Sequence, residues 1–317
     1  MVRKKKVSFI VVFYNEEYNL PLVFEEIRKI EQLLPEVDYE IVFVDDGSKD
    51  NSWKVVKEFA SKYPFVKAVS FVRNFGAIQA VIAGMQVAEG DFLVDMASDC
   101  QEPVELFVSL LKENLEKGYE VSWGVRKSRQ DSFKSVLFSK FYYWIMRNFA
   151  IKNFPKEGLD AFCISKRVKE FILQNYTVTS NLHNLLYWAN FESGKVMYDR
   201  RERKKGKSKW SFSKKLNLFI NSFVSFSYAP LRFVTLMGII FLVLSLIWTT
   251  YIIIHAIVTG FPVPGYATIT SVLLFGFGIT NFSIGVISEY IWRILENVKP
   301  KPMFLIREKL NINSENK

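Results

Sequence analysis

The chain has 317 residues, of which 50% are hydrophobic and 23% charged, and its formal net charge is +10. This much charge excludes a protein embedded in a membrane along its whole length. The two cysteines, Cys100 and Cys163, exclude a disulfide framework or a cysteine-rich metal site and suit a reducing cytosol. The positive charge leaves nucleic acid, anionic lipid headgroups or a phosphorylated substrate as candidate partners.

The N-terminal half alternates between strand and helix patterns. Short runs of β-branched and aromatic residues predict strands at Val7–Phe13, Glu40–Val44, Val66–Val72, Asp91–Met96 and Tyr119–Val125. Helical spacing predicts helices at Leu20–Leu33, from Asp50 or Asn51 to Lys62, at Ala77–Ala88 and at Glu102–Lys117. Strands separated by helices of this length predict βαβ units and an α/β domain with a Rossmann-like, mostly parallel sheet.

Polar clusters follow the carboxyl ends of the predicted strands. They are Asn15-Glu16, Asp45-Asp46, Arg73-Asn74, Asp99 and Arg126. Ligands of open parallel sheets bind at the carboxyl ends of the strands. The sequence therefore predicts a binding site at that edge of the sheet.

Two acidic segments among these clusters carry candidate chemistry. The turn Asp45–Asp50 offers carboxylates that can accept hydrogen bonds from a base N–H or from ribose hydroxyls, and it has neither Gly-rich phosphate-loop pattern. Asp99 and Gln101 are two residues apart, so both can face one ligand. Their oxygen atoms suit Mg²⁺ or Mn²⁺ bridging a diphosphate. A helix-capping turn is the alternative interpretation of each segment.

A long uncharged stretch predicts two membrane spans. The 56 residues from Phe233 to Ser288 contain no Asp, Glu, Lys or Arg, and one spanning helix needs roughly 20 apolar residues. The segment Gly260–Gly265 divides the stretch into spans at about Phe233–Thr259 and Tyr266–Ile287. A pair of buried core helices is the alternative. Both flanks are basic, which predicts an inner-membrane protein whose N-terminal domain faces the cytoplasm.

Two aromatic segments with interspersed basic residues, Ser132–Ala150 and Lys209–Tyr228, predict amphipathic helices in the membrane interface. Packing on the soluble core is the alternative for both. We therefore expect a cytosolic domain over residues 1–208, a juxtamembrane region over 209–231, a transmembrane hairpin over 232–294 and a cytosolic tail over 295–317, which is polar after Leu310.

An ordered set of motifs resembles a known enzyme family. The motifs are Phe13–Glu17 (FYNEE), Val44–Asp50 (VDDGSKD), Arg73–Gly76 (RNFG), Asp99–Pro103 (DCQEP) and the basic run Arg200–Trp210. Together they are similar to family 2 glycosyltransferases of the GT-A fold, in particular the dolichol-phosphate-mannose-synthase-like group. Bacterial members of that group move a sugar from a nucleotide sugar onto undecaprenyl phosphate. The resemblance extends from about Val7 to Pro302.

The resemblance implies roles for the residues that match. Nucleotide-binding roles fall on Phe13, Asn15, Glu16, Asp45, Asp46 and Ser98, and metal-binding roles on Asp99 and Gln101. Asp160, in the segment Gly158–Phe162, would lie near the acceptor and join Asp99 and Arg126 as a catalytic residue. Ala97 stands where the family's first metal-motif Asp is usual, so no contact of that Asp is carried over.

The acceptor chemistry adds a requirement for cations. A phosphate monoester has a second pKa of about 6, so much of it is already a dianionic nucleophile at neutral pH. It needs cationic positioning against a metal-neutralised diphosphate leaving group. The candidate acceptor-phosphate residues are Arg126, Arg129, Arg200, Arg203, Ser208 and Lys209. Binding of anionic lipid headgroups is the alternative for residues 200–215, and we expect both roles there.

The sequence thus predicts a metal-dependent glycosyltransferase of the hexosyltransferase type, with a role in a cell-envelope glycan. It would move one sugar from a UDP- or GDP-linked donor to a polyprenyl (undecaprenyl) phosphate. Two alternatives stay open: a glycosyltransferase with another lipid or a polysaccharide as acceptor, and a non-catalytic membrane protein that binds a nucleotide sugar. We expect no nucleic acid partner, and the pattern is compatible with a homo-oligomer.

Overall fold

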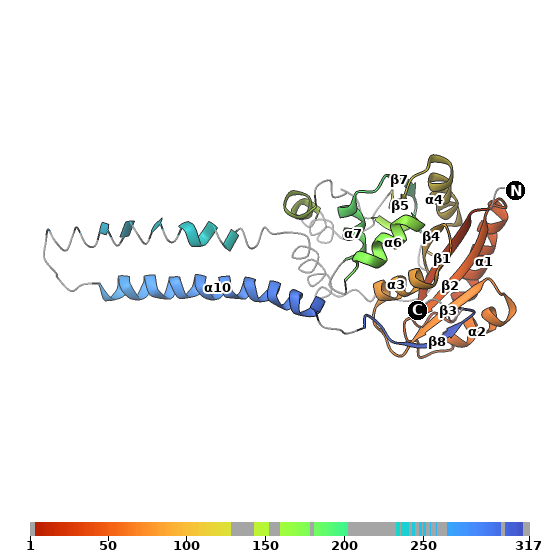
Figure 1. Cartoon of the computed structure of the whole chain (residues 1–317), viewed down its shortest axis with the longest axis horizontal. Coiled ribbons are helices and arrows are strands. Elements are labelled where there is room, and N and C mark those ends of the chain that lie inside the picture. Colours follow the sequence, from red (N-terminus) through yellow and green to blue (C-terminus); the bar gives the residue numbers. More distant parts are fainter. Residues whose placement is uncertain are drawn as a thin grey trace.

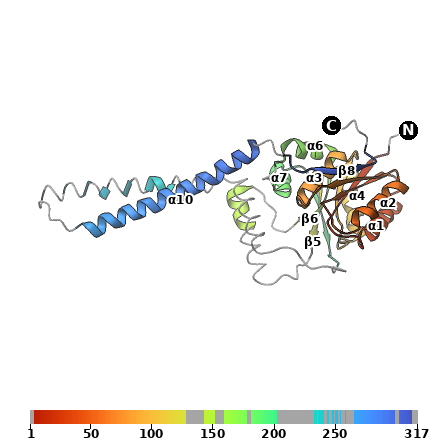
Figure 2. The same ribbon diagram turned by 90° about the horizontal axis from the view of Figure 1, so that it is seen from below.

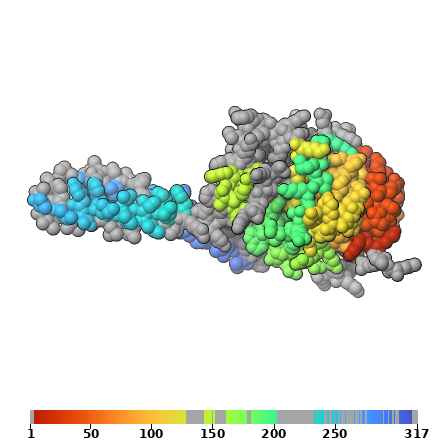
Figure 3. Space-filling model, turned by 90° about the horizontal axis from the view of Figure 1, so that it is seen from above, coloured from red at the N-terminus to blue at the C-terminus, as the bar shows by residue number. Residues whose placement is uncertain are grey.

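The structure is a computed structural model that describes residues 4–127, 143–151, 159–177, 181–201, 265–298 and 302–312, together with separate residues between 233 and 258. Most of the described residues fold into an α/β domain, and the helix α10 (Tyr266–Val298) projects from it (Figure 1). The described residues between 233 and 258 project in the same direction (Figure 3).

The domain is built on a single eight-stranded sheet with the order β7-β5-β6-β4-β1-β2-β3-β8. The strands are β1 (Lys6–Phe13), β2 (Asp38–Asp45), β3 (Val66–Phe71), β4 (Phe92–Ala97), β5 (Val121–Arg126), β6 (Leu159–Ser165), β7 (Ser193–Tyr198) and β8 (Ile306–Leu310). Only β6 and β8 run antiparallel to their neighbours. The predicted mostly parallel sheet is therefore confirmed, and each of the five predicted strands is present.

Helices cover both faces of this sheet (Figure 2). On one face lie α1 (Leu20–Leu33), α2 (Ser52–Lys62) and α4 (Val104–Lys117). On the other lie α3 (Ala77–Val87), α6 (Lys166–Asn175) and α7 (Leu182–Ala189). Residues 143–151 include a short π-helix, η1 (Met146–Ala150). Because both faces are covered, the central strands are near-continuous apolar runs rather than alternating ones, and all six residues of β3 are buried.

The predicted membrane-associated segments are described only in part. The predicted second span falls within α10, whereas most of the first span, most of Ser132–Ala150 and all of Lys209–Tyr228 lie outside the described residues. Among the described residues, no helix combines the length and the mean hydropathy that a bilayer crossing requires.

The segment assigned to a tail contributes to the fold. Its first residues continue α10, and Ile306–Leu310 form β8, an edge strand antiparallel to β3 that the sequence analysis did not predict. The Phe304 ring stacks on Phe71 with ring centroids 4.9 Å apart. Asn311 donates from Nδ2 to the carbonyl oxygens of Ala60 and Val66. The chain therefore returns from α10 to the sheet domain and packs on its core.

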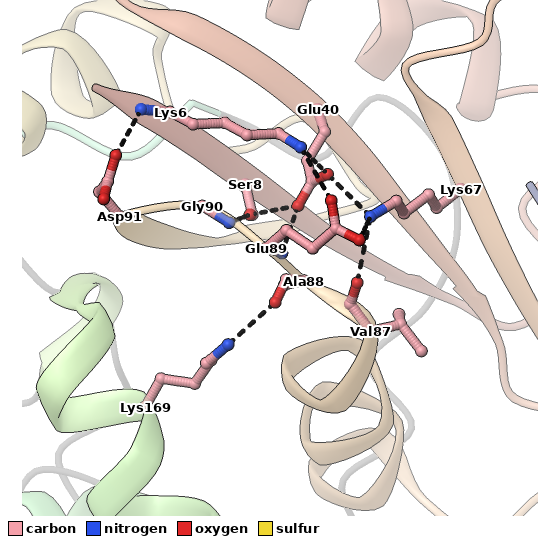
Figure 4. Close-up of polar contacts among 10 residues, drawn as sticks. All are labelled: Lys6, Ser8, Glu40, Lys67, Val87, Ala88, Glu89, Gly90, Asp91 and Lys169. Atoms are coloured by element: carbon pink, nitrogen blue, oxygen red, sulfur yellow. Dashed lines mark hydrogen bonds and ion pairs between the residues drawn. The ribbon is translucent and has the colours of Figure 1, made fainter. Parts of the chain in front are cut away.

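A buried charge network ties the amino-terminal ends of the central strands together (Figure 4). Glu40 of β2 is 1% exposed, and its Oε2 lies 2.7 Å from Lys6 Nζ and 3.1 Å from Lys67 Nζ. Its Oε1 accepts hydrogen bonds from Ser8 Oγ at 2.7 Å and from the Glu89 N–H at 2.6 Å. Burial raises the pKa of Glu40, but these partners outweigh it and leave the pKa below its usual value.

Replacing Glu40 is expected to destabilise the domain. Glu40→Gln removes the buried carboxylate that Lys6 and Lys67 share and leaves them only the more exposed carboxylate of Glu89, so the free energy of unfolding should fall by about 3 kcal/mol. Because the folded-state pKa is lowered, the contribution is fully present above the unfolded value of about 4.3 and is lost as pH falls through the folded pKa. Urea unfolding at pH 7 and pH 3.5 measures both effects.

The matched control for this substitution is Glu25→Gln, an acid-to-amide change at an exposed position of α1. It should leave the free energy of unfolding within about 0.5 kcal/mol of the wild type. Equal stability of the two variants at pH 7 would show that the Glu40 network contributes nothing net.

Candidate active site

The carboxyl ends of the parallel strands bring most of the predicted polar clusters to one edge of the sheet. The loop after β1 interlocks with the loop after β2, because Asn15 N donates to Ser48 Oγ at 3.0 Å and Lys49 N donates to Asn15 Oδ1 at 2.8 Å. Asn15 has a φ of 56°, a left-handed conformation that asparagine tolerates. Glu16 joins the same contact region, since its N–H donates to Ser52 Oγ at 2.9 Å.

Asp45 ends β2 in a fully buried position, with 0% of the residue exposed. Its Oδ1 accepts from Ser48 N at 2.8 Å. Its Oδ2 accepts from Ser70 Oγ at 2.7 Å and from Arg307 Nη2 at 3.3 Å. The carboxylate therefore organises the turn after β2 and joins it to β3 and β8.

Asp46 fixes the loop that leads into α3. It is 3% exposed, and its carboxylate accepts from Phe75 N at 2.7 Å and from Gly76 N at 3.1 and 3.2 Å. Gly76 has a φ of 107°, which a side chain would disfavour. Burial is the main cause that raises the pKa of Asp46, and the two hydrogen bonds limit the rise. Both predicted nucleoside carboxylates thus have protein partners, and their direct contact with a nucleoside stays a prediction.

The predicted metal-binding residues form a tight turn after β4. Asp99 Oδ1 accepts from Gln101 N at 3.4 Å, and Cys100 between them is buried with a φ of 54°. Gln101 Nε2 donates to Arg201 O at 3.3 Å, so the amide oxygen is the atom that would bind an ion. Ser98, directly before the turn, is 8% exposed.

This donor set fits a hard divalent cation. Carboxylate and amide oxygens are ligands that Mg²⁺ and Mn²⁺ accept. Within the part of the chain that the structure describes, no group of three or more His, Cys, Asp or Glu side chains is placed to hold an ion. An ion at Asp99 and Gln101 would need further ligands, which water and the diphosphate of a substrate commonly supply to Mg²⁺.

The chain that leaves β7 crosses directly over this turn. Arg200 Nη2 lies 3.8 Å from Asp99 Oδ2 and 3.7 Å from Glu102 Oε1. The backbone is held there by a hydrogen bond from Arg201 N to Gln101 O at 2.9 Å. Arg201 Nη1 is anchored by an ion pair with Glu26 Oε1 at 2.8 Å. The structure therefore places the first residue of the basic run beside the predicted metal ligand.

The other predicted site residues have different surroundings. Phe13 is buried, and its ring centroid lies 6.3 Å from that of Phe43, so it packs in the core. Arg126 ends β5 at the same edge as the polar clusters and pairs in register with Tyr198. Asp160 lies on β6, but its side chain is not described. Arg129, Arg203, Ser208 and Lys209 lie outside the described residues.

Two groups at this edge were not assigned to the site by the sequence analysis. Asp95, inside β4, has its pKa raised to about 7 by burial and by the nearby Glu102 carboxylate. Arg307 reaches Asp45 from β8, a strand separated from it by more than 250 residues of chain. Its contact depends on that distant pairing, so the local sequence around it carries no signal of a site.

Comparison with known proteins places these features in a family. Residues 8–168 match the family described as glycosyl transferase family 2, and residues 229–294 match the GtrB C-terminal hairpin. An uncharacterised glycosyltransferase of Synechocystis, sll0501, is 34% identical over 96% of this chain and 95% of its own length. The SfII prophage-derived bactoprenol glucosyl transferase of Shigella flexneri is 32% identical over 96% of this chain and 98% of its own length.

Among solved structures, the mannosyltransferase PcManGT of Pyrobaculum calidifontis, in complex with GDP-Man and Mn²⁺, is 17% identical. The match covers 65% of this chain and 59% of that protein, with a TM-score of 0.47. The family match spans half of the chain, and the relatives are covered over nearly their whole length at more than 30% identity. The chain therefore belongs to glycosyl transferase family 2, and it is a glycosyltransferase.

Proposed function

We propose that this glycosyltransferase moves one sugar from a UDP- or GDP-linked donor to a polyprenyl phosphate and releases the nucleoside diphosphate. The observation that carries the proposal is the position of Arg200, which begins the basic run and lies beside Asp99 of the metal turn. A cationic segment beside the metal turn suits a phosphate acceptor, because the acceptor's phosphate would be held next to the diphosphate end of the donor. The bactoprenol glucosyl transferase named above supports the same class of acceptor.

The donor occupies the carboxyl edge of β1, β2 and β4. Asp99 and Gln101 would hold Mg²⁺ or Mn²⁺, and the ion would supply charge neutralisation to the diphosphate leaving group. The loops fixed by Asp45 and Asp46 receive the nucleoside, together with Asn15, Glu16 and Ser98. Phe13 acts from the core by supporting the loop after β1, since its ring is buried.

The acceptor reacts through a phosphate oxygen. That oxygen forms the new bond to the anomeric carbon of the sugar, and the bond from this carbon to the donor diphosphate breaks. No proton has to be removed from a dianionic phosphate, so positioning by cations is the main requirement. Among the described residues, Arg126 and Arg200 supply this cationic positioning. We propose that Arg129, Arg203, Ser208 and Lys209 complete the acceptor site and that Asp160 lies near the reacting atoms.

The acceptor's lipid chain calls for membrane contact. The described side chains of α10 include many exposed large apolar residues, for example Ile269, Phe277 and Ile287. The match of residues 229–294 to a C-terminal hairpin supports two spans there. We therefore propose that the hairpin over 232–294 crosses the inner membrane, that the juxtamembrane region lies in its interface, and that the domain faces the cytoplasm. A homo-oligomer is compatible with this arrangement.

Transfer of radiolabelled sugar tests the proposal. Purified full-length protein with Mg²⁺ or Mn²⁺ and undecaprenyl phosphate should convert at least one of a panel of UDP- and GDP-sugars to a lipid-extractable product. The product should be a monophosphate-linked sugar. The absence of lipid-linked label with every donor of the panel, from protein that still binds a nucleotide, would contradict the proposed acceptor.

A further inference from the structure

Arg307 occupies an irregular position in the edge strand β8. In the pairing with β3, Ser70 is opposite Glu308 and Phe71 is opposite Ile306, so Arg307 is the extra residue of a β-bulge. In a regular strand Ile306 and Glu308 would point to the same face of the sheet, and the bulge places them on opposite faces. Glu308 contacts Trp53 and Lys57 of α2, whereas Ile306 packs against the apolar cluster on the other face. Bulges next to active sites commonly redirect a side chain in this way.

The guanidinium of Arg307 lies beside the residues that are predicted to bind the nucleoside. Arg307 Nη2 donates to Ser70 Oγ at 2.7 Å and to Asp45 Oδ2 at 3.3 Å. Asp45 is fully buried, whereas the Arg307 side chain is 45% exposed. A guanidinium has five N–H donors. Those on Nε and Nη1 have no hydrogen-bond partner among the described residues, so part of the group stays available to a ligand.

Strand order indicates which part of a nucleotide this group would meet. Asp45 ends β2, which is separated from β4 and its metal turn only by β1. Two strand spacings amount to about 10 Å. A nucleoside diphosphate with its phosphates at Asp99 therefore extends its nucleoside toward β2 and β3, where Arg307 lies.

We propose that Arg307 is a nucleotide-site residue supplied by the C-terminal strand. Its Nη2 holds Asp45 and Ser70 in place, and its exposed N–H groups donate to a carbonyl oxygen of the nucleotide base. Uracil and guanine carry such an oxygen, and adenine does not. The inference rests on the proposed nucleotide-sugar donor, but it does not depend on the identity of the acceptor.

Binding measurements without acceptor test this inference. Isothermal titration of the full-length protein with UDP, GDP, ADP and pyrophosphate, in the presence of Mg²⁺, would compare the wild type with Arg307→Gln and Lys309→Gln. Lys309 is an exposed residue of the same strand, so both variants remove one positive charge from β8. Arg307→Gln should weaken the preferred nucleoside diphosphate at least about tenfold. Its pyrophosphate affinity should be unchanged, and Lys309→Gln should match the wild type for both ligands.

Other results would overturn the inference. An equal loss for pyrophosphate would assign Arg307 to the phosphates, and no loss relative to Lys309→Gln would make its role purely structural. Wild-type protein that binds neither UDP nor GDP would refute the proposed function itself, which is a distinguishable outcome.

A second variant, Arg307→Lys, distinguishes a loss of nucleotide binding from a loss of folding. Arg307→Lys keeps a cation against Asp45 and should preserve the thermal midpoint measured without nucleotide. A single ammonium lacks the planar fork that reaches Asp45, Ser70 and a base together. Nucleotide binding should therefore still weaken, and wild-type affinity of this variant would count against the inference.

Discussion

Asp99→Asn is expected to lower kcat/KM for sugar transfer at least about 1,000-fold, because it removes the one carboxylate of the metal turn. The turn is held by the backbone hydrogen bond from Arg201 N to Gln101 O, and the asparagine keeps an Oδ1 that can accept from Gln101 N, so the fold should persist. The variant also removes one of the two carboxylates beside Arg200, and the other, Glu102 Oε1 at 3.7 Å, remains. Initial rates of transfer at saturating metal, together with the thermal midpoint, measure the two effects separately.

The control for this variant is Asp38→Asn. Asp38 is an exposed residue at the opposite end of β2, so the same chemical change there should alter kcat/KM by less than about twofold. If Asp99→Asn retained more than a tenth of wild-type activity, the carboxylate would not be the principal metal ligand, and the site would have to be placed elsewhere on the sheet edge.

Removal of β8 is expected to unfold much of the sheet edge. A chain that stops after Val298 loses the stacking of Phe304 on Phe71 and the contacts of Glu308 with Trp53 and Lys57. It also exposes the apolar edge strand β3. Burial of each large apolar side chain contributes about 1.5–3 kcal/mol, so the free energy of unfolding should fall by at least about 5 kcal/mol. Urea unfolding and limited proteolysis report the loss.

A chain that stops after Ile312 is the matched truncation, because it retains β8 and removes only the last five residues. It should unfold like the full-length protein. Equal resistance of the two truncated chains to urea and protease would show that β8 adds nothing to the domain.

The sequence predicted the part of the fold that depends on local pattern. The strands β1 to β5 and the four helices between them have strong apolar periodicity, and their observed ends lie within a few residues of the predicted ones. The later strands β6 and β7 are no shorter than β3 to β5, whereas β8 has five residues of which the middle three are charged. Their pairing joins segments distant in the chain, so no local pattern indicates it.

The same distinction applies to the candidate site. The basic run, rather than a strand end, singled out Arg200. Strand-end position placed Asp46, Asp99 and Arg126 together, because parallel strands bring their carboxyl ends to one edge. It did not indicate that Asp45 would be buried beneath Ser70 and Arg307, since those partners come from two other strands. The bulge that directs Arg307 is likewise a property of the pairing with β3.

The acceptor phosphate is the central claim, and one comparison tests it most directly. Purified full-length protein would receive its best nucleotide sugar with either undecaprenyl phosphate or undecaprenol, which has the same chain but no phosphate, in identical bilayers. Labelled product should form from undecaprenyl phosphate at least about 1,000-fold faster than from the alcohol, since the cations at Arg126 and Arg200 have no dianion to position in the second case. Equal rates for both lipids, or transfer to neither by protein that binds the nucleotide sugar, would contradict the account.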